Sequence, residues 1–141
     1  MPQPKRLVVG VGNWLAGDDG FGVAVIAALR ARARPVAADV LDAGTDLLRY
    51  IERFASYDEV ILVDAVIDPS RRGEVAAVEE EELRDWPDAS PGCHEISPLT
   101  ALRLFRLLHP SAHTRFTLVA LFTQRIEGIG FGNGLCIDVR R

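Results

Sequence analysis

A nearly continuous apolar run from Glu59 to Val66 is the strongest constraint on what this 141-residue chain can fold into. A strand that is apolar on both sides suits the centre of a parallel sheet whose two faces are both covered. Further apolar runs and segments with helical spacing alternate along the chain, which predicts an α/β fold: a three-layer sandwich with a mixed, mostly parallel sheet and helices on both faces. The other expected strands are 7–12, 36–41, 74–78 and 116–122, and the main expected helices are 21–33, 47–54 and 98–108.

Local signals refine these elements. Asp18 or Asp19 suits the start of the helix at 21–33, because a carboxylate accepts the free N–H groups of a first turn. Ser97 followed by proline predicts the start of the helix that continues to Leu108. The link between 59–66 and 74–78 is too short for a parallel crossover, so we expect these strands to be antiparallel, with 74–78 near an edge.

Composition excludes several classes of protein. The chain is 48% hydrophobic, which argues against disorder, and its length suits a single domain, 1–141. A net charge of −4 argues against a nucleic-acid partner. There is no long uncharged apolar run for a membrane and no signal-peptide core, and two cysteines make no disulfide framework. We therefore expect a cytoplasmic protein.

Sites in such sheets lie beyond the carboxyl ends of the strands. This rule gathers 13–19, 42–45 and Asp64 into one crevice, and the loop with His94 enters the helix at Ser97 near the same rim. The glycines of the first loop do not predict a nucleotide site, because two aspartates follow where a phosphate loop needs lysine and a hydroxyl. No nucleotide cofactor is expected.

A metal site fits the crevice better. Asp18 or Asp19, Asp64 and His94 would make a mixed oxygen and nitrogen ligand set with open positions for water or substrate. Each residue also has a simpler interpretation as a helix cap, a turn residue or a surface histidine. A nucleophilic mechanism has less support, since Cys93 and His94 are adjacent and point apart in extended chain, and no serine elbow is present.

The segment 9–23, with Gly-Asp-Asp-Gly at its centre, resembles the opening segment of the hydrogenase maturation endopeptidases. The segments 42–45, 63–65, 94–97 and 117–120 resemble that family's later segments in the same order. The resemblance implies an aspartyl-type endopeptidase that removes a C-terminal extension from the large-subunit precursor of a nickel–iron hydrogenase after nickel insertion. It places Asp19, Asp64 and His94 at the metal-contacting and catalytic positions.

The resemblance further implies that Asn13, Gly44 and Thr45 contact the substrate chain, and that nickel is supplied by the precursor. Two mechanisms stay open: a metal-bound water attacks the scissile carbonyl, or the three side chains recognise nickel already in the precursor. We favour nickel recognition with water attack near the same site. The alternative function is a non-catalytic module that binds metal or the hydrogenase precursor.

The chain departs from the family pattern at two places. Ala43 stands where the family has a glycine, which would restrict the turn if that position needs a positive φ. The chain also ends at Arg141, so we expect a short or missing C-terminal helix.

Overall fold

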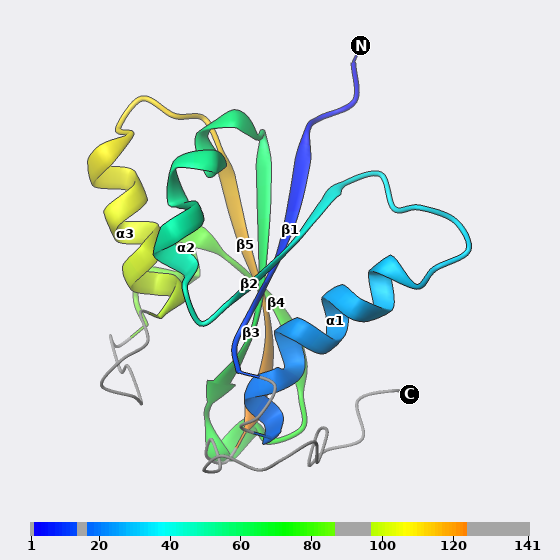
Figure 1. Cartoon of the computed structure of the whole chain (residues 1–141). Helices are drawn as coiled ribbons and strands as arrows, with labels where there is room; N and C mark the ends of the chain where they lie inside the picture. Colours follow the sequence, from blue (N-terminus) through cyan, green and yellow to red (C-terminus); the bar gives the residue numbers. More distant parts are fainter. Residues whose placement is uncertain (1, 14–16, 87–96, 124–141) are drawn as a thin grey trace.

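One five-stranded sheet organises the computed structural model, which describes the backbone of residues 2–13, 17–86 and 97–123 and, except at 18 and 19, their side chains. The strand order is β2-β1-β3-β5-β4, with β4 antiparallel to its neighbour and the other pairs parallel. Helix α1 covers one face, and η2 and α3 cover the other (Figure 1), which confirms the predicted three-layer α/β fold. The elements are β1 (Arg6–Val11), η1 (Gly17–Gly20), α1 (Phe21–Arg30), β2 (Asp39–Gly44), η2 (Leu47–Ser56), β3 (Glu59–Ile67), η3 (Pro69–Arg71), β4 (Val75–Glu79), α2 (Glu80–Leu83), α3 (Pro98–Leu108) and β5 (Arg115–Thr123).

Strand β3 is the middle strand of the sheet, as its apolar sequence predicts. Val60 and Leu62 pack into the large core under η2 and α3, whereas Val63 and Ala65 pack on the α1 side. Side chains alternate between the two faces of a strand, so a strand covered on both faces must be apolar at both sets of positions.

An aromatic cluster fills the larger core layer. The rings of Phe54, Phe105 and Phe116 come from η2, α3 and β5, and their centroids lie 5.1–6.2 Å apart. All three side chains are fully buried. Truncating such a side chain to alanine costs about 3–5 kcal/mol, so this cluster anchors α3 and η2 to the sheet.

The helix predictions are correct in type and partly wrong in detail. Helix α1 ends at Arg30, before the predicted Ala33. Its N-cap position is Gly20 rather than Asp18 or Asp19, whose side chains fall outside the description, so a carboxylate contact with the first turn stays a prediction. Helix α3 begins as predicted: the Ser97 hydroxyl accepts the N–H of Thr100 over 3.1 Å. The buried residues of α3 are Leu99, Ala101, Leu102 and Phe105. Leu108 lies in the last turn of the helix and is 53% exposed.

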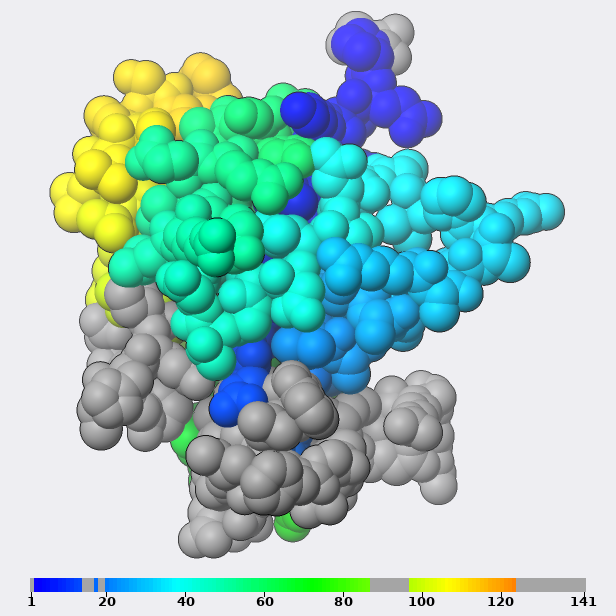
Figure 2. All heavy atoms as spheres, viewed as in Figure 1, coloured from blue at the N-terminus to red at the C-terminus, as the bar shows by residue number. Residues whose placement is uncertain are grey.

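Strand β2 lies later in the chain than predicted. It begins at Asp39 rather than Val36 and runs through Asp42 and Gly44, which were expected to form a turn. The segment between α1 and β2 instead projects from the body of the molecule (Figure 2). The following helix, η2, is a 3-10 helix that buries Leu47, Ile51 and Phe54.

Strand β4 lies at an edge and runs antiparallel to β3, as predicted, but it pairs with β5, which lies between them. The expected C-terminal shortfall falls on 124–141, outside the described residues. Among the helices that the structure describes, none has the length and apolar character to cross a membrane.

Candidate functional site

The carboxyl ends of β1 and β2 are joined by one backbone hydrogen bond. The N–H of Gly12 donates to the C=O of Gly44 over 2.8 Å. Gly12 has a φ of 133° and Gly44 a φ of 55°, values that side-chain-bearing residues rarely adopt. The two loops that the sequence predicts at one crevice therefore lie next to each other, at the end of the sheet where β1 and β2 finish.

Asp64 is a buried carboxylate in the middle strand, β3, towards the same end of the sheet. Its residue is 8% exposed, and Oδ1 accepts the N–H of Ala65 over 2.8 Å. The pairing of β1 with β3 ends at Gly10 and Val63, so Asp64 lies just beyond the last pair of these two strands. Asp64 lies within β3, because the strand expected at 59–66 continues beside β5 as far as Ile67. By strand alternation Asp64 shares its face with Leu62, the face covered by η2 and α3.

Two glycines let α1 approach the ends of β1 and β3 very closely. A Cβ on Gly22 would lie 2.3 Å from both the Val11 and the Val63 carbonyl oxygens, and a Cβ on Gly10 would lie 2.4 Å from the Gly22 oxygen. No ordinary van der Waals contact is that short. The first turn of α1 therefore rests directly on the peptide group that joins Val63 to Asp64.

This close packing fixes the place of the Asp19 backbone. Asp18 and Asp19 lie in η1, the 3-10 turn that leads into α1 and that contacts β3. Their side chains fall outside the description. The structure thus brings the backbone of Asp19 to the part of the sheet where Asp64 lies, although they are far apart in sequence.

The beginning of α3 lies at the same end of the molecule as the ends of β1, β3 and β5 (Figure 1). His94 precedes Ser97 at this point of the chain but belongs to 87–96, outside the described residues. Its role as a ligand stays a prediction.

The predicted substrate-contacting residues surround the β1–β2 hydrogen bond. Asn13 is half-buried directly after Gly12, and Thr45 is exposed directly after Gly44. The Gly44 N–H donates to Asp42 Oδ1 over 2.9 Å, and a Cβ on Gly44 would meet no atom within 4 Å. Within the described part of the chain, nothing therefore crowds the side of Gly44 on which a side chain would project.

Ala43 does not strain the turn. It lies within β2, is 6% exposed in the core, and positive φ values occur only at glycines among the described residues. The concern that an alanine at this position restricts the turn is therefore not borne out, because the strand geometry that it adopts suits any residue.

No cluster of three metal-ligating side chains exists among the residues whose side chains are described. The set Asp19, Asp64 and His94 is not tested by this result, because Asp64 is its one member with a described side chain.

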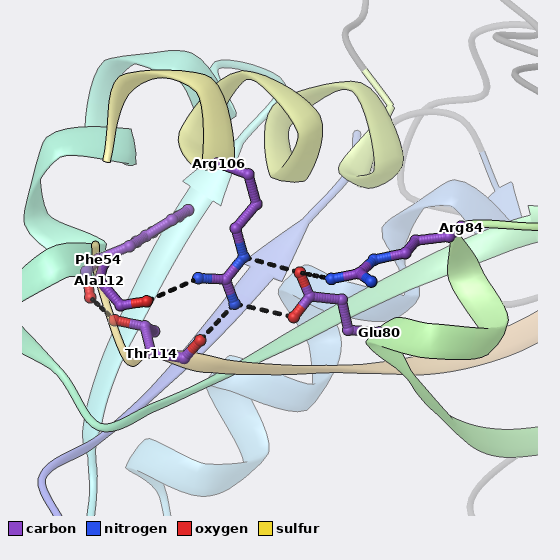
Figure 3. Close-up of polar contacts among 6 residues, drawn as sticks. All are labelled: Phe54, Glu80, Arg84, Arg106, Ala112 and Thr114. Carbon is purple, nitrogen blue, oxygen red and sulfur yellow. Dashed lines mark hydrogen bonds and ion pairs between the residues drawn. The ribbon is translucent and has the colours of Figure 1, made fainter. Parts of the chain in front are cut away.

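A polar network that the sequence did not predict lies at the other end of the sheet (Figure 3). Arg106 of α3 forms two hydrogen bonds of 2.8 Å with the Glu80 carboxylate and also donates to the carbonyls of Ala112 and Thr114. The hydrogen bonds with Glu80 raise the pKa of Arg106. The Thr114 hydroxyl donates to the Phe54 and Tyr57 carbonyls. This network ties α2, α3, β5 and η2 together; the helical spacing of Arg106 gave no sign of it.

Comparison with known proteins gives the family. The family model described as hydrogenase maturation protease matches residues 23–131. The hydrogenase 2 maturation protease of Escherichia coli is 33% identical over 125 residues, which cover 87% of this chain and 76% of that protein. The hydrogenase expression/formation protein HupD of Rhizobium leguminosarum is 34% identical over 89 residues, 62% of this chain and 44% of that protein.

Solved structures agree with these matches. The hydrogenase maturating endopeptidase HybD of E. coli superposes with a TM-score of 0.71 and 27% identity, covering 93% of this chain and 80% of that one. The maturation protease HybD of Thermococcus kodakarensis, at 21% identity and a TM-score of 0.66, covers 89% of this chain and 84% of that one and supports the fold alone. The chain spans less than two thirds of the length of several curated relatives, such as HupD. From the family match and the E. coli relative, the chain belongs to the hydrogenase maturation protease family.

Proposed function

We propose that the protein is an endopeptidase that removes the C-terminal extension from the large-subunit precursor of a nickel–iron hydrogenase, in the cytoplasm, after nickel has been inserted. Family membership supports the class of reaction. The observation that carries the proposal for this chain is the buried Asp64 carboxylate towards the carboxyl end of β3, the strand that the turn bearing Asp19 contacts.

The proposed ligands to nickel are Asp19, Asp64 and His94. Carboxylate oxygens and an imidazole nitrogen are a suitable donor set for a divalent first-row metal. Burial of a carboxylate is costly unless hydrogen bonds or a cation compensate its charge. A metal ion brought by the precursor would therefore bind most favourably where Asp64 is already withdrawn from water, and a precursor without nickel would lack this interaction.

Hydrolysis then needs a water molecule at the scissile carbonyl. Water adds its oxygen to the carbonyl carbon, the C–N bond breaks, and the amine of the released extension takes up a proton. Gly44 offers open space for the substrate backbone, and Asn13 and Thr45 lie on either side of the loop contact that holds it. We assign these three residues to positioning the substrate chain.

The test is to mix the purified protein with nickel-loaded and nickel-free precursor and to measure the product masses. We expect loss of a C-terminal peptide from the loaded precursor only. The variants Asp19→Asn, Asp64→Asn and His94→Ala should lose at least about a hundredfold in cleavage rate. Asp58→Asn is the matched control, because Asp58 is an exposed carboxylate directly before β3, at the opposite end of the sheet from this site, and this variant should cut at the wild-type rate.

Each outcome bears on a separate part of the proposal. Failure to cut loaded precursor, under conditions in which a known maturation protease cuts its own, refutes the endopeptidase function. Stable binding without cutting supports the alternative of a precursor-binding module. Equal cleavage of nickel-free precursor refutes nickel recognition. Normal cleavage by the Asp19 and His94 variants refutes the assigned site.

A further inference from the structure

Strand β4 is an outer strand of the described sheet. Within the described part of the chain, no strand pairs with its outer side. The N–H of Phe122 donates to the C=O of Glu74 over 2.9 Å, so this C=O faces β5, whereas the N–H of Glu74 donates to the C=O of Arg71. Because this direction alternates along a strand, the N–H and C=O groups of Val75 and Ala77 and the N–H of Glu79 point away from the sheet. The C=O of Glu79 accepts the first hydrogen bond of α2, of which Glu79 is the N-cap residue.

The outer edge is also accessible and partly apolar. Val75 is 51% exposed, and Ala77 and Glu79 are exposed as well. The strand contains no proline or lysine, which are common protections of an edge strand. An edge with unpaired backbone groups and an exposed apolar residue is suited to pairing with another strand.

We propose that β4 pairs in antiparallel fashion with β4 of a second copy of this chain, about a two-fold axis at Ala77. In this register Val75 faces Glu79 of the other copy, and Ala77 faces its own equivalent. The outward N–H groups of Ala77 and Glu79 then meet the outward C=O groups of Ala77 and Val75 of the other copy. Small side chains at the axis avoid a steric clash.

The charges on either side of β4 favour a second copy as the occupant. Arg71 and Arg72 precede the strand and 79–82 is a run of glutamates. Antiparallel pairing of two identical strands places the basic end of one beside the acidic end of the other, at both ends of the pair. The arrangement is complementary by symmetry, as an isologous interface requires.

Some charged side chains near β4 are already neutralised by ion pairs within the same copy. Glu74 pairs with Arg71 over 3.1 Å, and Glu80 with Arg106 over 2.8 Å. Arg72 and Glu82 are exposed and form no ion pair with a described residue. These two side chains are therefore available to interact between copies.

A single short strand pair is smaller than a standard stable interface, so the dimer should be weak and reversible. The two-fold axis points the carboxyl ends of the two sheets in opposite directions. Both candidate sites thus stay open, and the proposal does not depend on the function proposed above.

The first test is sedimentation velocity from micromolar to near-millimolar concentrations of the full chain. We expect a concentration-dependent rise from monomer to dimer in the wild type. Ala77→Pro removes an outward N–H without breaking a bond to β5, and proline is tolerated on edge strands; this variant should stay monomeric. Ala77→Ser keeps the N–H and is the matched control, which should dimerise like the wild type.

The second test is a charge exchange. Arg72→Glu or Glu82→Arg alone should raise the dimer dissociation constant about tenfold, since each change turns symmetric attractions into repulsions. The double variant should recover dimerisation to within about threefold. Circular dichroism of each variant checks that it is folded. A wild type that stays monomeric overturns the proposal, and so does a dimer that survives Ala77→Pro or a double variant that is no better than the singles.

Discussion

Replacing Gly22 by alanine should destabilise the protein, against the intrinsic preference of helices. Alanine is the more favourable helix residue by about 1 kcal/mol. A Cβ at this position, however, would lie 2.3 Å from the carbonyl oxygens of Val11 and Val63, whereas ordinary contact begins at 3.4 Å. Helix α1 must therefore move away by about 1 Å, or the ends of two strands must shift.

The size of the effect follows from these two terms. Overpacking typically costs about 1–3 kcal/mol, and the upper end applies because both atoms that obstruct the Cβ belong to the backbone. Subtracting the gain in helix propensity leaves about 2 kcal/mol of net destabilisation. For a domain of this size, that lowers the Tm by about 6–10 °C.

Urea unfolding and thermal melts followed by circular dichroism measure this difference. Ala27→Gly is the matched control: Ala27 is exposed on the same helix, so the reverse substitution there should cost about 1 kcal/mol from propensity alone. If Gly22→Ala is as stable as the wild type or more stable, the argument that α1 rests on the peptide before Asp64 is refuted.

Three further changes probe the polar groups. Thr114→Val should cost about 1–3 kcal/mol, because it leaves buried carbonyls without their donor. Glu80→Gln should cost about 1–3 kcal/mol, because the bidentate bond of Arg106 loses its charge. Asp39→Asn should lower the pKa of Tyr57, which the hydrogen bond to Asp39 raises. That bond stabilises the fold fully below the ordinary tyrosine pKa of 10.0 and is lost as the pH rises through the raised value.

Each of these has a direct check. Urea unfolding measures the stability of Thr114→Val and Glu80→Gln. Unfolding midpoints equal to that of the wild type would contradict these two predictions. Thr117→Val, at a partly exposed hydroxyl with a 3.5 Å contact, is the control for Thr114 and should change stability little. Ultraviolet titration of tyrosinate, with Tyr57→Phe to assign the signal, measures the third, and an unchanged titration in Asp39→Asn would contradict it.

The pattern of apolar residues was enough to predict the layers and the sheet. The continuous run at Glu59–Ile67 requires cover on two faces, and this property determined its central place. The boundaries of β2 were harder, because Asp39 and Asp42 are polar within the strand. They are tolerated because β2 lies at the edge of the sheet and its polar side chains have local partners, such as the Tyr57 hydroxyl at Asp39.

Contacts between distant segments account for what the sequence could not predict. Nothing local in 103–108 indicates that Arg106 pairs with Glu80, which is 26 residues away. Nor does it indicate that Leu108 is exposed. The placing of β5 between β3 and β4 is likewise a long-range choice. The short link between β3 and β4 predicts only that these two strands are antiparallel. It allows β4 to lie directly beside β3 or on the far side of β5.

The position of the Asp19 turn shows why two glycines matter more than a helix cap here. An aspartate before an apolar helix is usually explained by the N-cap position, but Gly20 occupies that position in α1. The turn is held instead by the close contact of Gly22 with the ends of β1 and β3, which requires a residue without a side chain. The N-cap position of α1 is thus filled by a residue other than Asp19. Since we assign Asp19 to the metal chemistry proposed with Asp64, the stability of Gly22→Ala and the activity of Asp19→Asn should change independently.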